Sequence, residues 1–182
     1  MVEYLTREQL RRSGGTITET ASILRKAASR SPAGSSFLSH SSQDVDILPA
    51  AIKILEDHGA QVYVDKKDET LPPTTNRETA AALRDRIQQC RKFILLATAN
   101  CKDSRWAPWE LGLADGYRRT PNIAIFPGLD SLSDRTWAER EYLGVYDRVV
   151  YGQHANYPNP VYMVWNQTNN TGTELRAWLQ RP

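Results

Sequence analysis

From residue 35 onward, short apolar runs alternate with segments whose apolar residues recur every three or four positions. A short apolar run is typical of a buried strand, and the longer period is typical of a helix with one apolar face. The runs predict strands at 36–39, 60–65, 92–98 and 122–126. The periodic segments predict helices at 44–58, 75–90, 106–117 and 174–180.

The boundaries of these elements carry recognisable signals. Asp44 and Asp46 are expected in the first turn of their helix, where acidic side chains favour the positive end of the helix dipole. Asp44 is therefore interpreted as part of a helix start rather than as a chemical group. Gly59 is expected to end that helix, and Pro127-Gly128 to end the fourth strand.

Consecutive strand–helix units predict an α/β fold with an open, parallel, five-stranded sheet and helices on both faces. The fifth strand comes from either 148–151 or 161–165. In such sheets, ligands bind beyond the carboxyl ends of the strands.

Residues 1–33 differ from the rest of the chain, because their helical pattern is broken by Ser-Gly-Gly and is rich in arginine. A Ser-Pro-Ala-Gly sequence at 31–34 is typical of a linker. We therefore expect a helical N-terminal extension at 1–33 and an α/β domain at 35–182. The extension is either a solvated helix packed on the domain or a segment for assembly or partner binding.

Composition and charge narrow the classes of function. A net charge of +2 does not favour nucleic acid or an anionic membrane as a partner. No apolar run approaches the ~20 residues of a membrane span, and no secretory signal is visible, so a cytoplasmic location is expected. Two cysteines and three histidines lack metal-ligand spacing, so we expect free thiols and no metal site.

The rule for ligand binding in parallel sheets selects a set of candidate residues. They are Ser39, His40 and Ser41 after the first strand, Asp65, Lys66 and Lys67 after the second, and residues 100–106 after the third. Glu110 lies one turn into the helix that follows. Trp106 precedes Glu110 by four residues, which places both on one helix face. An aromatic side chain beside a carboxylate suits the binding of a ligand in which a flat cationic ring adjoins the bond to be cleaved.

Each candidate also has a purely structural interpretation. Glu110 also fits an exposed helix acid, and Trp106 and Trp109 also fit anchors in the core. His40 also fits a packing residue at a strand end, and Asp65 a turn former. No arrangement of serine, histidine and acid indicates a hydrolase triad.

Four segments in order resemble a known family. Residues 37–44 read Phe-Leu-Ser-His-Ser-Ser-Gln-Asp, residues 62–65 read Val-Tyr-Val-Asp, and residues 87–96 pass from a helix into the third strand. Residues 104–111 read Ser-Arg-Trp-Ala-Pro-Trp-Glu-Leu. Together they resemble the TIR (Toll/interleukin-1 receptor) domain, and 104–111 matches the Ser-x-Trp-x-x-x-Glu-Leu signature of its NAD-cleaving members. The segment after the second strand, which is called the BB loop in this family, differs from the family pattern. There, Leu71 is followed by Pro72-Pro73, where the family usually has a glycine.

The resemblance implies a flavodoxin-like TIR fold and an NAD+ glycohydrolase or cyclase that releases nicotinamide and leaves ADP-ribose or a cyclic isomer. It implies Glu110 as the catalytic residue. It also implies substrate-binding residues, namely Trp106, Ser39, His40, Ser41, Asp65 and Leu71. NAD+ is then the substrate and no cofactor or metal is required. The chain is similar to TIR subunits of bacterial anti-phage systems such as Thoeris, which implies contacts with other TIR domains and a separate effector protein that senses the product.

The chemistry of NAD+ fits a single acid. The nicotinamide leaves as a neutral group and needs no proton, so the acid of an ordinary glycosidase pair is dispensable. One carboxylate can stabilise positive charge on the ribose. Two other functions remain open: a TIR scaffold that acts by assembly without chemistry, and an enzyme similar to nucleoside deoxyribosyltransferases, which also place a glutamate beside a sugar.

Overall fold

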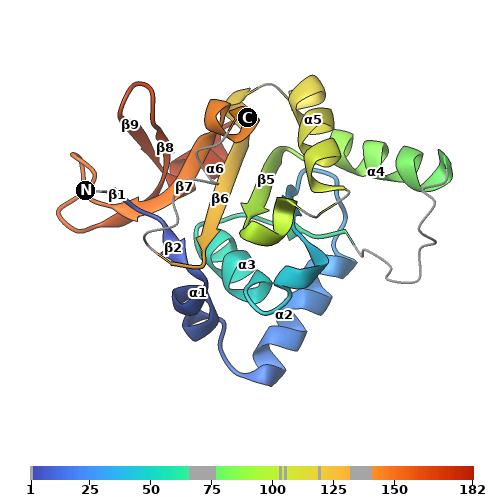
Figure 1. The fold of residues 1–182 in the computed structure, drawn as a ribbon, viewed down its shortest axis with the longest axis horizontal. Coiled ribbons are helices and arrows are strands. Elements are labelled where there is room, and N and C mark those ends of the chain that lie inside the picture. The colour runs from blue at the N-terminus through green and yellow to red at the C-terminus, as the bar shows by residue number, and fades with distance from the viewer. Residues whose placement is uncertain (1, 66–76, 103, 105, 119, 132–140) are drawn as a thin grey trace.

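The computed structural model describes residues 2–65, 77–102, 104, 106–118, 120–131 and 141–182, and Figure 1 shows them as a central sheet between helices. In chain order, the first elements are β1 (Val2–Glu3), β2 (Leu5–Thr6), α1 (Arg7–Ser13), α2 (Ile17–Ser29), β3 (Ser36–Ser39), η1 (Ser42–Asp44), α3 (Leu48–Asp57), β4 (Val62–Tyr63) and α4 (Arg77–Gln89). The remaining elements are β5 (Lys92–Ala97), η2 (Ala99–Lys102), α5 (Ala107–Arg118), η3 (Thr120–Asn122), β6 (Ile123–Leu129), η4 (Glu141–Val145), β7 (Asp147–Gly152), β8 (Val161–Asn166), β9 (Thr171–Glu174) and α6 (Leu175–Gln180).

The sheet has the order β4-β3-β5-β6-β7-β8-β9, and its first five strands are parallel. This confirms the predicted α/β fold with a five-stranded parallel sheet. β7 supplies the fifth parallel strand, so the first of the two predicted alternatives is right. The second alternative forms β8, which pairs antiparallel with β7 and β9. The antiparallel extension was not predicted.

Successive residues of the central strands point to opposite faces of the sheet, and both faces are buried. Phe93 and Leu95 of β5 pack with α4 and α5, whereas Ile94 and Leu96 pack with α1, α2, α3 and α6. Each fully buried side chain of this kind contributes roughly 1.5–3 kcal/mol to stability. Helices therefore cover both faces, as a parallel sheet requires.

The N-terminal segment is helical, as expected, with α1 and α2 on either side of the Gly14-Gly15 break, and it also joins the sheet. β1 pairs antiparallel with β7, and β2 pairs parallel with β6. Leu10 of α1 is fully buried. The division of the chain near residue 34 stays a prediction, but the segment packs firmly on the rest of the molecule.

Two predicted boundaries are wrong. Residues 42–44 form a 3-10 turn and α3 begins only at Leu48, so Asp44 and Asp46 precede the helix. β6 continues through Pro127-Gly128 to Leu129, because β2 pairs alongside its last two residues. The predicted end of α3 is confirmed, since Gly59 follows it at φ +91°. The helix start expected at residue 75 lies outside the described residues.

Candidate active site

Glu110 lies in the first turn of α5, and its side chain is 0% exposed. The hydroxyl of Ser39, the last residue of β3, donates a hydrogen bond to its carboxylate. The contact joins residues that are 71 positions apart in the sequence. It places the acid at the carboxyl edge of the parallel sheet, where the sequence rule predicted a ligand site.

The signature segment shapes the start of α5. The hydroxyl of Ser104 accepts the backbone N–H of Ala107 at 3.1 Å, which satisfies one of the amides left open at the start of a helix. Trp106 was predicted inside the helix, but it lies immediately before the first residue. Its carbonyl accepts the N–H of Glu110 at 2.8 Å, so the two residues are still one turn apart. The carboxylate of Glu110 lies at the positive end of the helix dipole.

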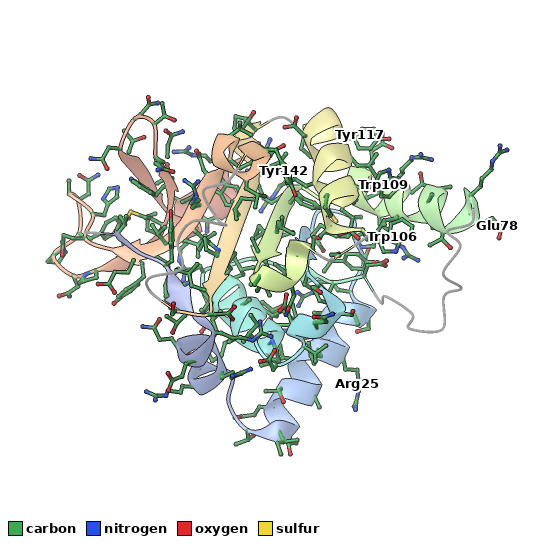
Figure 2. All side chains as sticks on the ribbon, viewed as in Figure 1. Arg25, Glu78, Trp106, Trp109, Tyr117 and Tyr142 are labelled. Carbon is green, nitrogen blue, oxygen red and sulfur yellow. The ribbon has the colours of Figure 1, made fainter. Side chains whose placement is uncertain are left out.

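Trp106 and Trp109 form an aromatic pair at the start of α5 (Figure 2). Their ring centroids are 5.4 Å apart in an edge-to-face arrangement. Both are half-buried against the core, and the guanidinium of Arg84 from α4 lies 5.4 Å from the Trp109 ring. Trp109 therefore connects α5 to α4 as well as to the core. Trp106 keeps enough exposed surface to contact a bound ring.

His40 and Ser41 follow Ser39 directly and are buried. The Nδ1 atom of His40 lies 3.4 Å from the carbonyl of Leu38, and the Ser41 hydroxyl accepts the N–H of Gln43 at 3.3 Å. Ser41 caps the single turn of η1, and α3 begins only at Leu48.

Asp65 follows β4 and is held by structural partners. It accepts a hydrogen bond from the Tyr63 hydroxyl at 3.0 Å and forms an ion pair with Arg86 of α4. Burial raises the pKa of Tyr63, and the neighbouring Asp65 carboxylate raises that pKa further. These contacts favour the structural interpretation of Asp65, in which it fixes the end of the strand. Leu71 lies outside the described residues.

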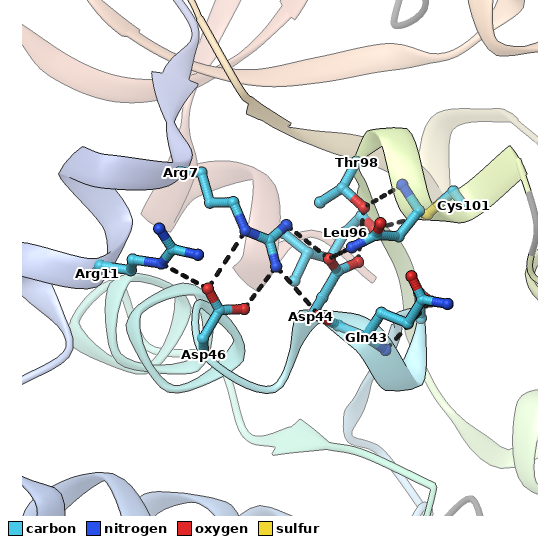
Figure 3. Close-up of polar contacts among 10 residues, drawn as sticks. Arg7, Arg11, Gln43, Asp44, Asp46, Leu96, Thr98 and Cys101 are labelled. Atoms are coloured by element: carbon cyan, nitrogen blue, oxygen red, sulfur yellow. Dashed lines mark hydrogen bonds and ion pairs between the residues drawn. The ribbon is translucent and has the colours of Figure 1, made fainter.

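Asp44 is the residue of this region that the sequence interpretation missed (Figure 3). Its side chain is 0% exposed and accepts hydrogen bonds from Thr98 at 2.6 Å and from Asn100 at 2.6 Å. Arg7 of α1 completes the set with an ion pair at 2.8 Å. Asp44 lies a few residues beyond the selected Ser41, and its position shortly after a strand was the available signal.

The described residues contain no group of three or more metal-ligating side chains. Cys90 and Cys101 are both buried, the Cys101 thiol donates a hydrogen bond to the carbonyl of Leu96 at 3.2 Å, and burial raises the pKa of the Cys90 thiol to about 12. A buried thiol with a raised pKa is a poor nucleophile. Across the part of the chain that the structure describes, no helix is long and apolar enough to cross a membrane.

Comparison with known proteins gives two matches. A family model described as "TIR domain" matches residues 37–147, which include α5, all of β3 but its first residue, and the Ser39–Glu110 contact. A protein of Bacillus cereus (strain MSX-D12), described as "Probable 3' cyclic ADP-D-ribose synthase ThsB'", is 34% identical over 148 residues. The alignment covers 80% of this chain and 75% of that protein.

Proposed function

The chain belongs to the TIR domain family, and on that premise we propose that it cleaves the nicotinamide–ribose bond of NAD+ as a glycohydrolase or cyclase. The observation that carries the proposal is the buried Glu110 carboxylate, held by Ser39 at the carboxyl edge of the sheet and beside Trp106. The name of the similar Bacillus cereus protein supports the same reaction class.

Glu110 acts on the ribose in this proposal. As the glycosidic bond breaks, its electrons leave with the nicotinamide, which departs as a neutral ring, and the ribose develops oxocarbenium character. A fixed carboxylate stabilises that charge more than water does, because it is already oriented and desolvated. The carboxylate then accepts the proton of the attacking hydroxyl. That hydroxyl belongs to water in a hydrolase and to the ADP-ribosyl group itself in a cyclase.

The other candidates receive distinct roles. Trp106 is proposed to pack against the cationic nicotinamide ring by stacking and cation–π attraction. His40 and Ser41 are proposed to contact the nucleotide beside it, and Leu71 remains a proposed substrate contact on the resemblance alone. Ser39 is reassigned from a substrate contact to a positioning residue, because its hydroxyl is engaged with Glu110. NAD+ is the substrate, and no cofactor or metal is required for this chemistry.

The biological setting follows the same line. A cyclic ADP-ribose isomer would act as a signal in bacterial anti-phage defence, sensed by a separate effector protein in the cytoplasm. Association with further TIR domains is part of the proposal, because active sites in this family are often completed by a neighbouring copy. The similar protein's name, a cyclic ADP-D-ribose synthase, favours the cyclic product.

The test is incubation of the purified chain with NAD+, followed by separation of the products by chromatography and mass. We expect free nicotinamide and an ADP-ribose isomer from the native chain, and neither from Glu110→Gln. Protein concentration is varied over a wide range, so that a site completed by a second copy is not missed. Absence of nicotinamide at every concentration would reject the enzyme and favour the scaffold.

A further inference from the structure

Arg7, the first residue of α1, reaches across to the segment that follows β3. Its Nη1 atom pairs with Asp44 at 2.8 Å, and its Nη2 atom donates to the carbonyl of Gln43 at 3.1 Å and to Asp46 at 2.6 Å. The Arg7 side chain is only 14% exposed. Burial lowers its pKa, but the hydrogen bonds to Asp44 and Asp46 outweigh that effect and raise the pKa. The guanidinium is a fixed, charged fork between two carboxylates.

The backbone that carries Arg7 is held independently of these contacts. β2 immediately precedes α1 and pairs with the end of β6, in the register Leu5–Gly128. Thr6 caps α1 through the N–H of Gln9, and Leu10 is fully buried in the core. The position of Arg7 is therefore set by β2 and α1, and Arg7 in turn fixes the residues that it contacts.

The contacted segment is the one that begins at the candidate active site. It runs from Ser39, which holds Glu110, through His40 and Ser41 to Asp44. Asp44 lies at the other end of this segment, where it accepts hydrogen bonds from Thr98 and Asn100, just after β5. Because the Asp44 carboxylate is fully buried, its ion pair with Arg7 and the hydrogen bonds from the two neutral donors offset the cost of removing it from water.

We infer that Arg7 is a positioning residue for nucleotide binding: through Asp44, it fixes the backbone that presents His40 and Ser41 to the substrate. The inference rests on the proposed NAD+ reaction. It assigns to the N-terminal segment a part in the site, which neither the family match at 37–147 nor the signature segment contains. Ser39 belongs to β3 and is held by its pairing with Leu95 of β5, and Glu110 lies on α5, so Arg7 affects affinity for NAD+ and not the bond-breaking step.

The experiment compares Arg7→Ala and Arg7→Lys with Arg11→Ala as the matched control. Arg11 also lies on α1, but it is 57% exposed, and the carboxylate with which it pairs is that of Asp46 rather than that of Asp44. We expect Arg7→Ala to raise KM for NAD+ about tenfold with kcat within about twofold, and Arg11→Ala to change neither by more than about twofold. Arg7→Lys restores part of the affinity, because an ammonium supplies the charge without the fork.

Binding is measured directly in the Glu110→Gln background, where turnover does not complicate the dissociation constant. Arg7→Ala is expected to weaken NAD+ binding there by the same factor as KM. A merely structural role predicts something else, namely a loss of folded protein with unchanged KM. A fall in kcat at constant KM, or an equal effect of Arg11→Ala, overturns the inference.

A readout without turnover separates this inference from the proposed function. The N–H groups of Asp44 and Ile47 donate to Ser41 and Asp44 at 3.0 and 3.1 Å, so hydrogen exchange of these amides reports the segment. We expect exchange there to quicken about tenfold or more in Arg7→Ala, and not in Arg11→Ala. If the native chain releases no nicotinamide, the NAD+ reaction fails, but quickened exchange still shows that Arg7 orders the segment. Unchanged exchange rejects the inference whether or not the chain is an enzyme.

Discussion

Two fully buried carboxylates lie at the same edge of the sheet, and their surroundings differ. Asp44 accepts from Arg7, Thr98 and Asn100, which come from α1 and from the end of β5. Glu110 accepts from the hydroxyl of Ser39 and lies beside the two tryptophans at the start of α5. Burial alone therefore does not distinguish a structural acid from a catalytic one.

The neighbours make the distinction. The Arg7 guanidinium balances the charge of Asp44, and two neutral donors give its carboxylate further hydrogen bonds. Such a set of partners suits a residue that joins segments of the fold. A hydroxyl on a strand end and the first turn of a helix hold Glu110 at a defined place. The comparison predicts that Glu110 controls turnover, whereas Asp44 controls the stability of the fold and the order of the segment that leads to it from His40 and Ser41.

The largest expected effect is on turnover at Glu110. Replacing it by glutamine removes the negative charge that faces the ribose but preserves the shape, so nicotinamide release should fall by about 10³-fold. The melting temperature should change little. Chromatographic assay of nicotinamide beside a thermal melt measures both. Residual activity near the native level would move the catalytic role to another residue.

Asp44→Ala should act in the opposite manner. It leaves the buried Arg7 guanidinium without one of its carboxylates and leaves the Thr98 hydroxyl without its acceptor, so the free energy of unfolding should fall by about 3 kcal/mol or more. Urea denaturation measures the loss. Arg11→Ala serves as the control, because its exposed ion pair with Asp46 contributes little. A stable Asp44→Ala protein would break the comparison between the two acids.

The sequence predicted the parts of the fold that depend on local pattern. The parallel strands and the helices between them follow from apolar runs and helical periodicity, and the edge of the sheet that holds Ser39 and Glu110 follows from strand direction. Their direct contact spans 71 positions and was not predicted as a hydrogen bond, but the rule brought the two residues to one place.

The parts that were missed depend on contacts between distant segments. Asp44 was interpreted as a helix start because an acid before an apolar period usually is one. In the structure, Asp44 forms an ion pair with Arg7, which lies 37 positions earlier in the sequence, and α3 begins four residues after Asp44. The extension of β6 through Pro127-Gly128 depends likewise on β2, whose two residues carry no strand signal by themselves.

Ser39→Ala sharpens the comparison on the catalytic side. Without the hydroxyl, the Glu110 carboxylate loses a charge-assisted hydrogen bond that fixes its orientation, so kcat should fall about 10- to 100-fold. KM for NAD+ should stay within about twofold, since Ser39 does not contact the substrate in this arrangement. Ser39→Thr keeps a hydroxyl and should recover much of the rate. A rise in KM instead of a fall in kcat would return Ser39 to the substrate contacts.

The smallest expected effect is on the stability of the protein at acidic pH, and it concerns Asp46. Burial raises the pKa of Asp46, but hydrogen bonds from Arg11 and Arg7 outweigh it and hold that pKa below its ordinary value of 3.8. A carboxyl whose pKa is depressed by folding stabilises the folded state above its unfolded pKa, and the contribution is lost as the pH falls through the folded value. Asp46→Asn should therefore lower the free energy of unfolding by less than about 1 kcal/mol at neutral pH. The difference from the native chain should shrink as the pH falls from 3.8 through the lowered folded pKa of Asp46, and disappear once that carboxyl is protonated. Urea midpoints measured across this range test the sign, and a difference that grows on acidification would contradict the role of Arg7 and Arg11 as partners of Asp46.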